Sequence, residues 1–136
     1  MHCPKARFKK FAELDNWVFF STAMNSKLIN GSVLTIPWAA SVKQPSDTVV
    51  FLDNRLENEP EVHPGQDDWD LGQPSAFASR FSTRHRGTGN LAFGDGHVEN
   101  LRGPKVVDTA GGNPGRAIFP QVDIIWTPDS GMNPNY

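Results

Sequence analysis

Eleven prolines and twelve glycines are spread along the 136 residues without a period, and they divide the chain into short segments. This spacing favours strands and loops over long helices, because proline interrupts a helix and glycine weakens it. The length suits a single domain, and nine Phe and four Trp supply apolar side chains for its core. We therefore expect one domain over residues 1–136, mainly β or α+β, with a small antiparallel sheet.

The segment 48–53 reads Thr-Val-Val-Phe-Leu-Asp, follows Pro45, and is continuously apolar and β-branched until Asp53. This pattern predicts a central strand that is covered on both faces. Two weaker patterns lie at the ends of the chain. Residues 6–20 permit a short amphipathic helix, and the stretch 17–20 also permits a strand. Residues 122–127 predict a last strand with Val122, Ile124 and Trp126 on one face.

Asp95-Gly96 stands between two segments that contain apolar residues, 90–94 and 97–101. An Asp-Gly pair in this position predicts a β-hairpin with a type I′ turn, in which both turn residues have positive φ. Phe93 is then expected opposite Val98. Two polar or glycine-rich segments, 57–76 and 103–120, predict long surface loops.

The charge of the chain argues against nucleic-acid binding. The net charge is −2, with 13 basic and 15 acidic residues mixed along the sequence, so no basic surface for phosphates is expected. No apolar run approaches the roughly 20 residues of a membrane span. The single cysteine, Cys3, excludes a disulfide within the chain.

His85 is followed after nine residues by Asp95-Gly96, within the string Arg84-His85-Arg86-Gly87 and on to Asn90-Leu91-Ala92-Phe93-Gly94. This spacing resembles the signature of the prepilin-processing-associated H-X9-DG family. Cys3-Pro4, the segment 43–48 and the strand ending at Asp53 follow the order of that family, so the resemblance covers roughly residues 3–101. It implies an extracytoplasmic, bacterial, pseudopilin-like structural protein whose partners are subunits of a type II secretion or fibre system.

Proteins of this kind have a long apolar N-terminal helix, which this sequence lacks. We expect a domain that has been separated from such a helix and that is soluble by itself. The apolar strand 48–53 would then expose one face unless residues 6–20 or another copy of the chain covered it. A homodimer is therefore a hypothesis.

His85 and Asp95 are the motif residues with the clearest chemistry. His85 is a candidate base or metal ligand, although a histidine beside a hairpin more often fixes a loop by hydrogen bonding. Asp95 is a preferred turn residue, because its side chain can accept a hydrogen bond from the backbone two residues on. The motif is thus open to both a chemical and a folding interpretation.

Calcium is the cation that the sequence favours, since irregular loops rich in Asp, Asn and Gly supply its oxygen ligands. The resemblance to pseudopilins implies a site after Leu101. The candidate ligands are Asp53, Asp95, Asp108 and Asp123, with Asn113 and Asp129 nearby, and an alternative loop holds Asp67, Asp68 and Asp70. The four histidines and Cys3 show no spacing typical of zinc.

Two other functions remain open. The first is a metal-dependent hydrolase of an ester or lactone, such as a small signalling molecule, in which the cation polarises the carbonyl and His85 or His63 accepts a proton. The second is a binding module in which the loop from Glu57 to Pro74, which contains Trp69, holds a partner or a glycan.

Overall fold

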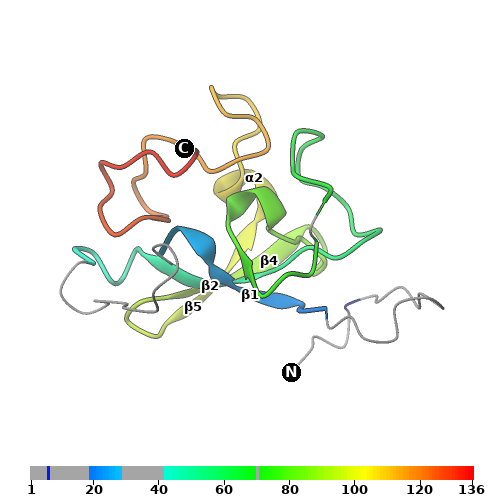
Figure 1. Cartoon of the computed structure of the whole chain (residues 1–136), viewed down its shortest axis with the longest axis horizontal. Helices are drawn as coiled ribbons and strands as arrows, with labels where there is room; N and C mark the ends of the chain where they lie inside the picture. Colours follow the sequence, from blue (N-terminus) through cyan, green and yellow to red (C-terminus); the bar gives the residue numbers. More distant parts are fainter. Residues whose placement is uncertain (1–5, 7–18, 29–41, 70) are drawn as a thin grey trace.

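The computed structural model describes residue 6 and residues 19–28, 42–69 and 71–136. Five strands form a single sheet in the order β3-β1-β2-β4-β5. The elements are β1 (Thr22–Asn25), the 3-10 helix η1 (Ser26–Leu28), β2 (Val49–Asp53), β3 (Ser75–Ala76), the 3-10 helix η2 (Ala78–Arg80), β4 (Thr88–Phe93), β5 (Val98–Arg102) and α2 (Gly103–Val106). Figure 1 shows α2 and the C-terminal segment on the same side of the sheet. The expected mainly β class is confirmed.

The sheet is mixed rather than antiparallel. β2 runs antiparallel to β1 and β4, and β4 runs antiparallel to β5, but β3 lies parallel to β1. The expectation of a purely antiparallel sheet is therefore wrong. β3 has only two residues and follows the long loop, so its direction is set by how that loop returns to the sheet and not by a hairpin turn.

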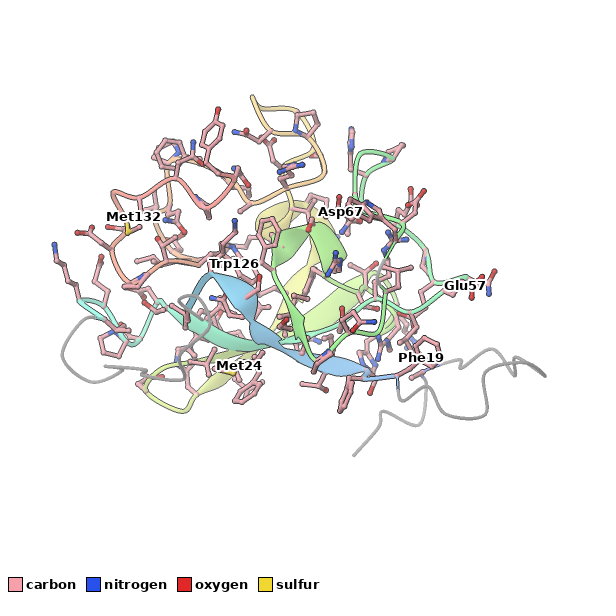
Figure 2. All side chains as sticks on the ribbon, viewed as in Figure 1. Phe19, Met24, Glu57, Asp67, Trp126 and Met132 are labelled. Atoms are coloured by element: carbon pink, nitrogen blue, oxygen red, sulfur yellow. The ribbon has the colours of Figure 1, made fainter. Side chains whose placement is uncertain are left out.

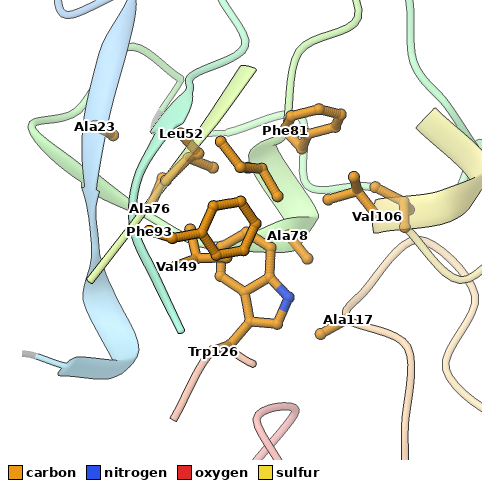
Figure 3. Packing of buried hydrophobic residues seen from close by; sticks show 12 residues of the cluster. Ala23, Val49, Leu52, Ala76, Ala78, Phe81, Phe93, Val106, Ala117 and Trp126 are labelled. Carbon is orange, nitrogen blue, oxygen red and sulfur yellow. The ribbon is translucent and has the colours of Figure 1, made fainter. Parts of the chain in front are cut away.

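The sheet buries one of its faces against the rest of the chain. Leu52 on β2 lies opposite Ala23 on β1 and Leu91 on β4, and all three are at most 1 % exposed. Because directly opposed residues point to the same face, they define the core side of the sheet. Figure 3 shows Trp126 among Val49, Ala78 and Ala117 on this side.

The C-terminal segment closes the core through main-chain and side-chain contacts. Thr48 and Ile125 form an isolated parallel bridge, and the Asn25 side-chain amide donates to the carbonyl oxygens of Val49 and Trp126, at 2.8 Å each. Residues 122–127 do not form the expected strand. Ile125 and Trp126 are both buried whereas Val122 is 69 % exposed, so the segment is not an alternating strand.

β2 is the central strand, as predicted, but it is not covered on both faces. Phe51 is 46 % exposed while Val49 and Leu52 are buried, because a bulge between Val49 and Phe51 shifts the alternation. The segment expected as a loop over 57–76 is a loop in its described part up to residue 74, but its last two residues form β3. The segment 103–120 begins with α2 and continues as a loop. The helix or strand expected over residues 6–20 falls almost wholly outside the described residues.

The predicted hairpin joins β4 to β5, but its turn differs from the expected one. Gly96 has φ of 95°, whereas Asp95 is not among the residues with positive φ. The Phe93 N–H donates to the His97 carbonyl at 3.0 Å, so the loop has three residues and ends in a left-handed glycine. Val98 consequently lies opposite Ala92, and the predicted pairing of Phe93 with Val98 is wrong.

Candidate functional site

His85 and Asp95, the two ends of the sequence motif, do not meet. His85 precedes β4 and Asp95 follows it, and a strand of six residues spans about 20 Å. Each residue instead contacts a neighbour at its own end of β4. The spacing of nine residues therefore reflects the length of a strand and its turn, not a shared site.

At the first end of β4, Asp53 gathers three groups around one carboxylate oxygen. Its Oδ2 accepts hydrogen bonds from the Asn90 main-chain N–H at 2.8 Å and from Asn90 Nδ2 at 2.9 Å. His85 Nε2 lies 3.5 Å from the same oxygen. Asn100 on β5 extends the cluster by donating to Asn90 Oδ1 at 2.9 Å. The structure thus brings together two of the predicted site residues, Asp53 and His85, from separate parts of the chain.

A second, buried cluster lies beside Asp53 and was not predicted. Glu59 Oε2 accepts hydrogen bonds from Ser82 Oγ at 2.8 Å and the Leu56 N–H at 3.1 Å, and it forms an ion pair with Arg84 Nη2 at 3.0 Å. The two charged side chains are only 5 % and 3 % exposed. Arg84 also donates to the carbonyl oxygens of Ser21 and Asn54. Ser82 is therefore a hydrogen-bonding partner within a structural ion pair.

The acidic loop, which contains Asp67 and Asp68, is held by Arg55. Arg55 lies two residues after the end of β2. Arg55 Nη1 lies 3.3 Å from Glu61 Oε1, and Nη2 lies 3.5 Å from Asp68 Oδ1 and also donates to the Asp67 carbonyl. Asp70, the third predicted ligand of this loop, is outside the described residues. The described part of the loop is thus organised around a buried guanidinium. The sequence signal that could have indicated this role is a charged residue, Arg55, close to the end of an apolar strand.

At the other end of β4, Asp95 fulfils the predicted turn role. Its Oδ1 accepts the His97 N–H at 3.1 Å, which is the predicted hydrogen bond two residues on, and lies 2.6 Å from His97 Nδ1. The His97 ring stacks on Phe93 with centroids 4.4 Å apart. The hydrogen bond that the His97 ring donates to Asp95 raises the pKa of His97, and the hydrogen bonds from the His97 N–H and ring lower the pKa of Asp95.

The carboxylates proposed for the C-terminal loop have separate environments. Asp108 accepts hydrogen bonds from the N–H groups of Ala110, Gly111 and Asn113, which lower its pKa. Asp129 pairs with Lys43 at 2.5 Å. Asp123 is exposed. In the part of the chain that the structure describes, His, Cys, Asp and Glu side chains form no group of three or more that could hold a metal ion.

The face of the sheet opposite the core carries a line of apolar side chains. Met24, Phe51, Ala92 and Val98 are consecutive register partners across β1, β2, β4 and β5, and we call them the apolar row. Phe51 is 46 % and Val98 is 62 % exposed, and the other two are half-buried. Figure 2 shows Met24 on the opposite side of the sheet from Trp126. The sequence indicated an apolar strand, but not that four strands would align these residues.

On the same face of the sheet, the side chains two positions along each strand from the apolar row are polar. Thr22, Asp53, Asn90 and Asn100 lie two residues from Met24, Phe51, Ala92 and Val98, so they point the same way. The Asp53 cluster therefore borders the apolar row directly. This face combines a partly exposed apolar row with a hydrogen-bonded polar margin.

Comparisons with known proteins return no match. No family model, no curated protein and no solved structure matches the chain. Within the described residues, no helix has the length and apolar character needed to cross a membrane. Function is therefore argued from the geometry of this chain.

Proposed function

We propose that this chain is a structural assembly module, the extracytoplasmic domain of a pseudopilin-like protein in a bacterial secretion or fibre system. The observation that carries the proposal is the apolar row, which four strands present on one face of the sheet and in which Phe51 and Val98 are exposed. Exposed apolar strips of this kind mark surfaces that another protein element covers. The resemblance of residues 3–101 to the H-X9-DG family supports the same assignment.

The energetics favour a partner that covers the row. Fully burying a Val or Phe side chain contributes about 1.5–3 kcal/mol, and Phe51 and Val98 still expose roughly half of their surface. Covering these two side chains therefore contributes about 2 kcal/mol to association. The hydrogen bonds of Asp53, Asn90 and Asn100 hold the adjacent backbone in place, so little ordering is required on binding. The partners are subunits of the assembly, including a second copy of the chain as a homodimer.

The test replaces Phe51 with arginine in the bacterium that carries the gene. Phe51→Arg is expected to abolish the secretion or fibre assembly that the wild-type chain supports. The free energy of unfolding of the purified variant is expected to stay within about 0.5–1 kcal/mol of the wild-type value. Trp69→Arg is the matched control, since Trp69 is 70 % exposed but lies in the acidic loop. Normal secretion and fibres in the Phe51→Arg strain, with the variant present at wild-type levels, would overturn the proposal.

A second candidate function rests on the contact between Asp53 and His85. Asp53 Oδ2 lies 3.5 Å from His85 Nε2 and can orient the imidazole, and the His85 side chain is 27 % exposed. This pair suits a general base in a divalent-metal-dependent ester or lactone hydrolase. Metal-stimulated turnover of a lactone that disappears in His85→Ala, with folding retained, would support this function. The same turnover in both proteins would remove His85 from the mechanism.

A further inference from the structure

A surface groove runs along the side of β5 that faces away from the apolar row. It consists of two adjoining depressions of about 290 Å³ and about 280 Å³, which share Lys105, Asp123 and Ile124. Glu99 and Leu101 of β5 line the first depression, and the alternation of a strand places them on the face opposite Val98 and Asn100. The groove is thus separate from the surface on which the proposed assembly depends.

Apolar side chains line both depressions, and the second depression is the more apolar of the two. Phe93, Leu101 and Ile124 line the first depression, and Ile118, Val122 and Pro120 line the second. Val122 is 69 % and Ile118 is 38 % exposed, so apolar surface reaches the solvent here. Two small depressions in series match the side chains of an extended peptide better than one compact small molecule, whose pocket typically encloses it.

The first depression also has charged and titratable side chains in its lining, and we call these residues the rim of the groove. Three carboxylates, those of Asp47, Glu99 and Asp123, line it together with one ammonium group, that of Lys105, and the His97 ring. His97 is already paired with Asp95 at 2.6 Å. The carboxylates of Asp47 and Asp123 form no ion pair or side-chain hydrogen bond with any residue that the structure describes. Within the described residues, these two carboxylates lie beside apolar side chains and have no side-chain partner.

We propose that this groove binds an extended peptide segment in which basic and aliphatic side chains alternate. Alternation in an extended chain sends successive side chains to opposite sides, so aliphatic groups enter the depressions while basic groups reach the rim. The excess of negative charge on the rim complements the basic groups and repels acidic segments. The partner is thus defined by charge as well as by shape.

The experiment uses the full chain and a fluorescein-labelled peptide in which lysine and valine alternate. Fluorescence anisotropy measures its binding, and the same peptide with glutamate in place of lysine is the control ligand. Binding of the lysine peptide is expected to weaken about two- to fivefold in Asp123→Asn, because exposed charge pairs contribute about 0.2–1 kcal/mol. Val122→Asp, which places a charge in the lining of the second depression at an exposed position, is expected to weaken it at least tenfold.

Asp68→Asn is the matched charge control, since Asp68 is 76 % exposed and belongs to the acidic loop. Retained binding in this variant, together with amide shift changes centred on Lys105, Val122 and Ile124 in an NMR titration, would establish the groove as the site. Equal weakening by Asp68→Asn and Asp123→Asn would show general charge attraction and overturn the proposal. Failure of the lysine peptide to bind, or equal binding of the glutamate peptide, would overturn it as well.

Discussion

Asp53 Oδ2 accepts two hydrogen bonds from Asn90, one from the main-chain N–H at 2.8 Å and one from the side-chain amide at 2.9 Å. A single carboxylate thus fastens the end of β2 to β4 and stands 3.5 Å from His85. Hydrogen bonds to a charged group contribute about 1.5–3 kcal/mol each, and less when they share one acceptor. This carboxylate links the central strand to the motif histidine.

Replacing Asp53 with alanine is expected to lower the free energy of unfolding by about 2–3 kcal/mol, because the Asn90 donors lose a charged acceptor. Urea denaturation of the purified variant measures this change. Asp123→Ala is the control, since Asp123 is exposed, and its effect is expected to stay within about 0.5 kcal/mol. Equal stability of the Asp53→Ala variant and wild type would show that the cluster does not stabilise the sheet.

Gly96→Val is expected to destabilise the hairpin by about 1–3 kcal/mol. Gly96 has φ of 95°, which a β-branched residue resists, while no atom lies within 4 Å of the position of an added Cβ. The cost therefore comes from the backbone alone. Gly112→Val is a matched control, because its added Cβ also meets open space and its φ is outside the positive region. Thermal unfolding should show a lower melting temperature for Gly96→Val than for Gly112→Val. Similar losses of stability in the two variants would argue against the left-handed turn.

Removing the buried charge of Glu59 is expected to cost about 3 kcal/mol or more. The Glu59→Gln change leaves the Arg84 guanidinium, which is 3 % exposed, without its counter-ion. Guanidinium denaturation gives the stability, and hydrogen exchange should show faster exchange in residues 56–68. Asp123→Asn, the same change from acid to amide at an exposed position, is expected to alter neither. A fully stable Glu59→Gln variant would contradict the structural role of this ion pair.

The contact between Asp95 and His97 predicts a pH-dependent hairpin. The raised pKa of His97 adds stability that is present at low pH and is lost as the pH rises through that pKa. The lowered pKa of Asp95 adds stability that is present at high pH and is lost as the pH falls through that pKa. The interaction is therefore strongest between about pH 4 and pH 6.5.

An NMR titration of the His97 ring protons tests this relationship. Asp95→Asn is expected to move the His97 midpoint to lower pH, because the carboxylate that stabilises the imidazolium is removed. Asp68→Asn removes the same charge from the acidic loop and should leave the midpoint in place. An unchanged His97 midpoint in Asp95→Asn would mean that the contact does not persist in solution.

Calcium binding after Leu101 stays a proposal, and thermal unfolding tests it. A calcium ion that binds only the folded chain raises the melting temperature relative to EDTA, whereas magnesium and zinc should not. Asp108 already accepts three main-chain hydrogen bonds, so Asp123→Asn is expected to reduce the calcium effect more than Asp108→Asn does. No response to any metal would remove both the calcium site and the metal-dependent hydrolase.

Local patterns predicted the elements whose residues carry their own signals. The apolar, β-branched run ending at Asp53 is the central strand, and Asp95-Gly96 does join two strands. The Asp95 side chain caps its own turn as a short polar residue is expected to do. These features depend on backbone sterics and hydrogen bonds over a few residues, which the sequence displays directly.

The register and the long-range contacts were decided by the tertiary structure. The turn has one residue more than predicted, so the cross-strand partner of Val98 is Ala92 and not Phe93. A shift of one residue in register exchanges the two faces of a strand. That register places Val98 in the apolar row. The pairing of Glu59 with Arg84 joins residues 25 apart, and Trp126 enters a core built from strands far earlier in the chain. The sequence by itself determined which of these segments become strands and turns. Only tertiary packing decided which charges are buried together and which apolar side chains stay exposed. These two outcomes depend on residues that meet only once the chain has folded.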